Sequence, residues 1–383
     1  MTTLLKRSKT GSPAERFTSR DPDAFAVPTG REEDWRFTPL RKLRPFFQPF
    51  EPDGVIEGDQ SVPAGARVEL VTPSSVAAFG SVLTPVDRVS ALAMANAVQG
   101  LHITVEPNAE LSEPIVLNRI GRSGRSLTHH VVEVGANARA TLVIDHQGHL
   151  EVAANIEIAV GDGAALDVIT VNDADAESIQ LSSYAARIGR DASYRHINVT
   201  LGGSVVRIVP TVSFAGPGGH AELLGVSFAG DGQHQEARLY VDHSEPDCVS
   251  NVVYKSVLEG DSAHTVWIGD VRIRPTATGT STYELNRNLL LSDGARADSV
   301  PNLEIETGEI AGAGHASATG RFDDLQLFYL QSRGIPEAEA RRLVVRGFLA
   351  DVVDRIDLPE LHDRLMAAID ARLGGVDLVG DAE

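Results

Sequence analysis

Histidines and the single cysteine are the side chains of this sequence best suited to metal chemistry. His146 and His149 are three residues apart, and on a strand that spacing directs their rings to opposite faces. The adjacent His129 and His130 diverge for the same reason. Cys248 cannot hold an iron–sulfur cluster alone, because such clusters need about four thiolates or their substitutes. The spacing therefore predicts structural histidines and a buried thiol, and three further histidines converge only if successive repeats stack them: His220, His234 and His243.

Motifs for nucleotide or covalent chemistry are missing. The sequence has no Gly-Lys dipeptide, which excludes a P-loop. The segment GAG at 312–314 lacks the third glycine of a dinucleotide fingerprint, and GHASATG at 314–320 has the wrong spacing for a nucleophile elbow. Three carboxylates leave polysaccharide cleavage open as an alternative, although a solvated acidic face explains them more simply: Glu157, Asp167 and Asp173. We expect that the chain is not an enzyme.

Composition limits the partners and the compartment. The net charge is −19, which repels phosphate backbones and anionic lipid, so we expect no nucleic-acid or membrane partner. A single cysteine excludes an intrachain disulfide, and no run of apolar residues is long enough for a signal peptide or a membrane span. These features predict a cytoplasmic protein.

A short turn recurs along the middle of the chain. It ends in Ala109, Ala138, Ala164, Ala192 and Ala221, which are 29, 26, 28 and 29 residues apart. Between the turns, apolar and polar residues alternate, as in the strand ending at 201. A near-constant period without helical inserts favours a β-solenoid, in which each turn of chain buries its apolar face against its neighbours, over a generic β-sandwich.

Both ends of the chain differ from this repeat. The first 50 residues are irregular, and apolar spacing predicts a helix over 86–98. After residue 322, helices are predicted over 323–333, from Pro336 onward and over 359–373, and these would cap the solenoid. The sequence thus divides into an N-terminal helical and irregular region (1–105), a β-helix core (106–310) and a C-terminal helical domain (311–383).

Several motifs resemble the SufB/SufD family of iron–sulfur cluster assembly proteins. The most specific is LFYLQSRGI at 327–335, followed by Gly347 and Phe348. The others lie throughout the chain: EDWRFTPL at 33–40, YKSVLEG at 254–260, NRNLLLS at 286–292, SVPNLEI at 299–305 and GHASATG at 314–320. Length and the short N-terminal region resemble SufD more than SufB.

The resemblance implies a right-handed parallel β-helix between two helical regions, in a complex with a SufB-like paralogue and a SufC-like ABC ATPase. It assigns iron or a nascent iron–sulfur cluster, shared with SufB, to His315, and it implies no cofactor held tightly by this chain alone. Many family members carry cysteine two residues before this histidine, where this sequence has Ala313. A structural role for His315 therefore stays open. The resemblance also places partner contacts at Phe328, Tyr329, Arg333, Gly334, Ile335, Arg341, Arg342, Gly347 and Phe348, of which the apolar members could equally pack the C-terminal cap.

Three functions follow from these observations. The first is a non-catalytic scaffold subunit that pairs with SufB and docks the SufC ATPase. The second is a stand-alone β-helix enzyme acting on polysaccharide. The third is a homodimeric iron-delivery protein that acts without SufB.

Overall fold

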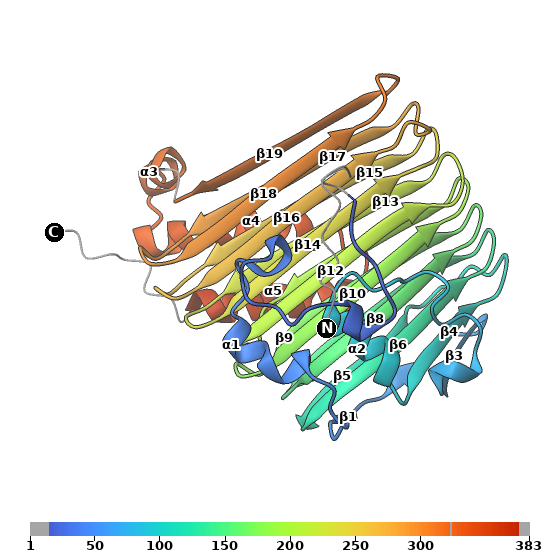
Figure 1. Ribbon diagram of the computed structural model, residues 1–383. Helices are drawn as coiled ribbons and strands as arrows, with labels where there is room; N and C mark the ends of the chain where they lie inside the picture. The colour runs from blue at the N-terminus through green and yellow to red at the C-terminus, as the bar shows by residue number, and fades with distance from the viewer. Residues whose placement is uncertain (1–14, 322–323, 375–383) are drawn as a thin grey trace.

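Two parallel β-sheets face each other along the length of the molecule. The computed structural model describes residues 15–321 and 324–374. Successive strands alternate between the sheets, so each turn of chain adds one strand to each of them. Figure 1 shows the strands stacked in sequence order, with the N-terminal segment across one face and two C-terminal helices behind the other. This arrangement is the predicted parallel β-solenoid.

The ten-stranded sheet contains β1 (Val55–Glu57), β5 (Ile115–Ser123), β7 (Arg139–Gly148), β9 (Ala165–Ala174), β11 (Ser193–Thr200), β13 (His220–Ala229), β15 (Val249–Leu258), β17 (Ser281–Leu290) and β19 (Gly312–Gly320) in that order, with β2 (Gln60–Ser61) beside β5. The nine-stranded sheet runs through β18 (Arg296–Ile305), β16 (His264–Ile273), β14 (His234–His243), β12 (Val205–Phe214), β10 (Ile179–Ile188), β8 (Glu151–Val160), β6 (Arg125–Val134), β4 (Gly100–Val105) and β3 (Ala66–Val71).

The recurring alanine turn fixes the repeat. At four of the five turns the residue before the alanine has a left-handed backbone, with φ of 61° at Asn108, 59° at Asn137, 67° at Gly163 and 51° at Asp191. At the fifth, the left-handed residue is Gly218, three positions before Ala221. Asn, Asp and Gly tolerate this conformation, which turns the chain from one sheet to the other. The alanine that follows is buried; Ala138, for example, is 0% exposed. The equivalent positions before β15 and β17 hold Cys248 and Thr280, both 0% exposed, so the turn requires a buried residue there, and alanine is only one of those that fit.

Side chains that point between the sheets form a mixed interior. Most are aliphatic, and they make one continuous cluster along the stack. One row on the ten-stranded sheet is polar in every turn, and strand register makes its members neighbours. We call this row the polar column: Arg119, His146, Asn172, Thr200, Ser227, Ser256, Asn288 and Thr319.

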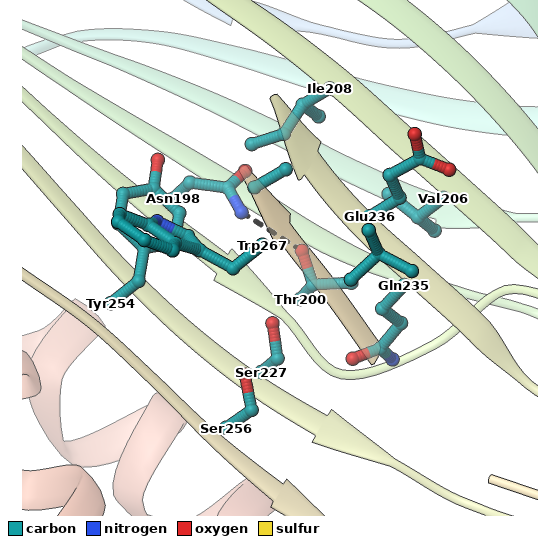
Figure 2. Close-up of a pocket in the computed structure, with 12 residues that line it drawn as sticks. Asn198, Thr200, Val206, Ile208, Ser227, Gln235, Glu236, Tyr254, Ser256 and Trp267 are labelled. Atoms are coloured by element: carbon teal, nitrogen blue, oxygen red, sulfur yellow. Dashed lines mark hydrogen bonds between the residues drawn. The ribbon is translucent and has the colours of Figure 1, made fainter. Parts of the chain in front are cut away.

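Hydrogen bonds between neighbouring turns satisfy parts of the polar column. Asn172 donates from Nδ2 to Asn198 at 2.9 Å, and Asn288 donates from Nδ2 to Thr319 at 3.0 Å. Beside Thr200 the interior leaves a cavity of about 10 Å³, room for about one water molecule (Figure 2). Buried polar groups are costly unless they are paired, so this row favours one fixed register of the turns.

Irregular and helical segments cover the outer faces. Over the nine-stranded sheet lie α1 (Leu40–Leu43) and α2 (Arg88–Asn96), together with short 3-10 helices, and Trp35, Phe46 and Phe47 pack on the strands. Over the ten-stranded sheet lie α4 (Glu337–Val353) and α5 (Pro359–Gly374), joined by apolar side chains to β7 through β17. The helix α3 (Asp324–Ser332) precedes them and contacts α4.

The structure refines the expected boundaries. The predicted helix over 86–98 is α2, and those from Pro336 and over 359–373 are α4 and α5. The helix predicted over 323–333 is α3, although residue 323 lies outside the described part of the chain. Four strands, β1 to β4, lie in the N-terminal region that we expected to be helical and irregular, and β19 continues the stack past residue 310. Within the described residues no helix is long and apolar enough to cross a membrane.

Glu284 is a buried carboxyl group near the last turn of the solenoid. It is 1% exposed, and neither carboxyl oxygen has a hydrogen-bond partner among the described residues. Its side chain extends across the interior to Gly269 and occupies the space that a side chain at position 269 would need. Burial raises the pKa of Glu284 to about 8, and the charge of Asp270 adds to the rise. The group is therefore mostly neutral at pH 7.

Glu284→Gln should change how stability depends on pH. Between about pH 4.5 and pH 8 the Glu284 carboxyl group is protonated in the folded wild type and ionised in the unfolded chain. In this window the group therefore lowers the free energy of unfolding by about 1.4 kcal/mol for each unit that the pH rises. Glutamine is neutral throughout, so the stability of the variant relative to the wild type should increase with pH. Urea unfolding across this range measures the difference.

Asn288→Ala provides the control, because it removes a buried polar group of the same strand without removing a titratable one. Its loss of stability should be independent of pH in this window. If the free energies of unfolding of the wild type and of Glu284→Gln changed in parallel from pH 5 to pH 8, this result would contradict a neutral carboxyl group at 284.

Candidate partner-binding and metal-binding surfaces

Both sheets end in strands with an open side. In the described part of the chain, β19 pairs with β17 alone and β18 pairs with β16 alone. The two end strands also meet each other, through a hydrogen bond of 2.7 Å from the Ser317 hydroxyl to that of Ser299. Open strand edges carry unused backbone donors and acceptors and are natural sites for pairing with another chain.

The open side of β19 can be assigned residue by residue. The Gly312 N–H donates to the carbonyl of Thr280, on the side of β17. Backbone groups of successive residues point alternately to the two sides of a strand. The N–H groups of Ala313, His315 and Ser317 therefore face the open edge.

The open side of β18 lacks one of its backbone N–H donors. The Arg296 N–H donates to the carbonyl of Ala263, on the side of β16, so odd-numbered residues of β18 face outward. One of them is Pro301, which has no N–H to offer. Proline on an outward position is a common way to block an edge strand. The edge of β19 is therefore better suited to pairing than that of β18.

His315 lies on β19 with its side chain on the interior side of the strand. It is opposite Glu284 in the strand register, and its imidazole is exposed because no further turn covers it. Ala313 lies on the same side, partly buried against the aliphatic interior. His315 is thus accessible at the open end of the solenoid, with both a free edge N–H and an imidazole available to a partner.

A complete metal site is not formed by the described residues of this chain. They contain no group of three or more His, Cys, Asp and Glu side chains arranged to hold a metal ion. Cys248 is 0% exposed, and burial raises the pKa of its thiol, which confirms the prediction of a buried thiol. Around His315, any iron would need further ligands from another chain.

The remaining histidines occupy different environments. His129 points outward and its Nε2 lies 2.6 Å from Glu157, whereas His130 points inward, so these neighbours diverge as predicted. Burial lowers the pKa of His130 to about 3 and that of His146, also inside, to about 4, with the charge of Arg119 contributing at both. They are neutral interior groups.

His220, His234 and His243 are not brought together. His220 is exposed, and His243 is buried with Nε2 2.9 Å from the Ser250 hydroxyl. His234 instead meets His264 on the next strand, with 3.1 Å between their Nδ1 atoms. The sequence did not predict this pair, whose members are 30 residues apart, because the contact arises only from the register of β14 and β16.

Helix α3 carries an exposed apolar face. Leu325 is 78% exposed, Phe328 69% and Tyr329 57%, and their spacing puts them on one side of the helix. We call these three residues the α3 patch. Phe328 does not pack the C-terminal cap, and its exposure removes that alternative for this residue. Large exposed apolar side chains grouped on one surface are typical of protein-binding sites.

The other candidate partner residues near α3 fall into two groups. Arg333 is exposed and its guanidinium lies 5.1 Å from the ring centre of Tyr329, beside the α3 patch. Gly334 ends the helix with a left-handed φ of 86°, and the half-buried Ile335 follows it. Arg333 is therefore the basic side chain best placed to act with the patch.

The candidates on α4 are less available. Arg341 pairs with Glu337 at 2.8 Å, and the Nε of the half-buried Arg342 is enclosed by protein. Gly347 is exposed. Phe348 is half-buried against the apolar cluster of α4, α5 and the ten-stranded sheet, with the ammonium group of Lys255 of β15 4.9 Å from its ring centre.

The three carboxylates considered for polysaccharide cleavage do not form a site. Glu157 is 0% exposed and accepts hydrogen bonds from the backbone N–H groups of residues 80, 82 and 83. Asp167 and Asp173 are on the outer face of the opposite sheet, paired with Arg195 and with Arg372 of α5. Because Glu157 is on the other sheet and covered, paired-carboxylate chemistry has no support here.

Comparison with known proteins agrees with these features. The sequence profile described as "SUF system FeS cluster assembly, SufBD core domain" matches residues 118–348. The iron–sulfur cluster assembly SufBD family protein of Mycobacterium tuberculosis is 50% identical over 376 residues, 94% of this chain and 92% of its own length. The corresponding protein of Mycobacterium leprae is 49% identical, covering 93% of each chain.

A second SufBD family protein of Mycobacterium leprae is more distant, with 31% identity over 206 residues, or 54% of this chain and 24% of its own length. That organism therefore has at least two members of the family, one of which matches this chain nearly end to end. From the match to the core domain over most of the solenoid and the full-length relatives, this chain belongs to the SufBD family of iron–sulfur cluster assembly proteins.

Proposed function

We propose that this chain is a non-catalytic, cytoplasmic scaffold subunit of an iron–sulfur cluster assembly complex. It pairs with a SufB-like paralogue through the open end of the solenoid and receives a SufC-like ATPase on its C-terminal helices. The observation that carries the proposal is the combination of an open β19 edge with His315 upon it. Energy from nucleotide hydrolysis comes from the partner, because the sequence contains no P-loop.

Pairing with a related solenoid follows from the chemistry of the end strand. A paralogue with the same fold would present a matching open edge, and the outward N–H groups of β19 would bond its backbone. The presence of two family members in one organism supports a partner of this type. A second copy of this chain could occupy the same edge in isolation, which is the homodimeric alternative.

Docking of the ATPase is supported by the α3 patch. Its aromatic members are the kind of side chain that contributes most to binding at protein interfaces. Arg333 beside the patch could pair with acidic groups of the partner. The patch lies outside the two solenoid sheets and so does not use the strand edge proposed for the paralogue.

His315 would supply one ligand to iron or to a nascent cluster that the paralogue shares. A neutral imidazole is a competent iron ligand. Ala313 offers no thiolate and the described residues nearby complete no metal site, so the remaining ligands would come from the paralogue. In this arrangement the chain holds no cluster alone.

Ser317→Pro tests pairing through β19. The substitution removes an outward N–H while leaving the bonds to β17, so the complex with a co-expressed SufB-like paralogue should weaken by about tenfold per interchain hydrogen bond lost. Ser317→Ala retains the N–H and should pair like the wild type. Affinity from co-purification and analytical ultracentrifugation decides, and equal pairing by both variants would rule out this edge.

Phe328→Ala and Tyr329→Ala test the α3 patch. Each should weaken binding of the SufC-like ATPase by at least about tenfold, because an exposed aromatic side chain buried in the complex is lost. The matched control is Tyr283→Ala, which removes a similarly exposed ring, 47% accessible, from the outside of β17. Calorimetric titration measures binding. If Tyr283→Ala weakened binding and the two α3 variants did not, the ATPase would bind elsewhere on the chain.

His315→Ala tests iron binding. Pairing with the paralogue should persist, since the backbone N–H remains, while iron retained by the reconstituted complex under anaerobic conditions should fall by at least about tenfold. If the isolated wild-type chain retained stoichiometric iron and His315→Ala abolished it, the homodimeric iron-delivery function would replace the shared site. Unchanged iron in the variant complex would leave His315 with a structural role.

A further inference from the structure

His234 and His264 form a pair on the outer face of the nine-stranded sheet. Each is the first residue of its strand, β14 and β16, and the strand register makes them direct neighbours. Their ring centres are 4.8 Å apart, with the ring planes at 71°. Neither takes part in the open edge or in the α3 patch.

Both imidazoles use Nε2 to meet a carboxylate. His234 Nε2 lies 3.0 Å from Glu236 Oε2, and His264 Nε2 lies 2.8 Å from Asp298 Oδ2. Burial would raise the pKa of Glu236, but Arg207 and the bond from His234 outweigh it and hold it at about 2. The pKa of Asp298 is lowered as well: burial opposes ionisation, but the bonds from Arg296 and His264 outweigh it.

These carboxylates determine where the imidazole protons are. An ionised carboxylate only accepts hydrogen bonds, so both Nε2 atoms must be the protonated donors. Both Nδ1 atoms of neutral rings then carry lone pairs, and these atoms lie only 3.1 Å apart. Two facing lone pairs repel each other unless a cation lies between them, either an extra proton or a metal ion.

We propose that His234 and His264 form a two-imidazole binding site, through their Nδ1 atoms, for a divalent first-row transition-metal ion. A neutral imidazole is the form that binds metal ions. Imidazole nitrogens suit Zn²⁺, Co²⁺ and Fe²⁺. Two nitrogens each about 2.0–2.1 Å from one ion are roughly 2.9 Å apart at a right angle and roughly 3.3 Å apart at the tetrahedral angle. The observed separation of 3.1 Å lies within this range.

The surroundings match those of metal-binding histidines. Such histidines usually donate their second ring N–H to a carboxylate, which orients the ring and increases its basicity. Here both do so, and both carboxylates are held by arginines: Glu236 by Arg207 at 3.2 Å and Asp298 by Arg296 at 2.8 Å. Thr38 of the N-terminal segment also bonds Glu236, at 2.8 Å.

The site is accessible from one side. The side chain of His234 is 6% exposed, whereas those of His264 and Asp298 are 20% exposed. An ion would enter from the side of β18 and keep water molecules in its remaining positions. The site is independent of the proposed function, since it uses neither His315 nor the paralogue.

Titration of the full-length chain with Co²⁺, followed by visible absorption, tests the site. We expect one Co²⁺ per chain with a spectrum of nitrogen ligation. His264→Gln should weaken binding at least about a hundredfold, and Asp298→Asn, which leaves both ligands in place, about ten- to a hundredfold. His220→Gln, which removes an exposed imidazole from the other sheet, should bind like the wild type.

Circular dichroism of each variant separates lost binding from lost folding, and Asp298→Asn keeps the test valid if His264→Gln unfolds. A wild type that binds no Co²⁺ would overturn the site and indicate a shared proton instead. Binding that is lost in His315→Ala but kept in folded His264→Gln and Asp298→Asn would also overturn it. Neither result bears on pairing with the paralogue, which Ser317→Pro tests.

Discussion

Backbone hydrogen bonding between successive turns is the constraint on which this molecule depends. Each strand within the stack is bonded on both sides by strands one turn away, so every inner turn takes its position from its neighbours. Such a stack must deal with two ends. At the start, short antiparallel strands finish the sheets: β3 beside β4, and β1 and β2 beside β5. At the other end β18 and β19 remain open in the described chain, and the candidate site lies there.

The outer faces obey a second requirement, because alternate residues of every strand point outward and many are apolar. The C-terminal helices cover one face with an aliphatic contact, whereas the N-terminal segment covers the other with aromatic rings and buried charges. Arg207, for example, is 4% exposed and bonds both Asp87 and Glu236. Breaking one partner of such a network leaves an uncompensated buried charge, so this cover has a defined position.

Much of this fold could be predicted from the sequence, because the solenoid repeats one local rule. Alanine follows a residue with a left-handed backbone at positions 109, 138, 164 and 192, and the helices begin and end at recognisable residues such as Pro336 and Gly334. Contacts between turns could not be predicted. The pairing of His234 with His264 requires the strand register, and the burial of Glu157 requires the loop at residues 80–83 to fold over β8. The exposure of Phe328 likewise depends on where α3 lies relative to α4, which spacing alone does not determine.

The difference between the two ends gives the stack a direction. If the stack had open edge strands at both of its ends, copies could add head to tail without limit, as in fibres. Here one end is finished by short strands and the other has a proline on one of its two edges. Two solenoids that meet open end to open end leave no further edge of β18 or β19 exposed for another copy. Assembly by this route therefore stops at a dimer. The short antiparallel strands at the first turn differ from the open strands at the last turn, so pairing through the last turn does not lead to unlimited growth.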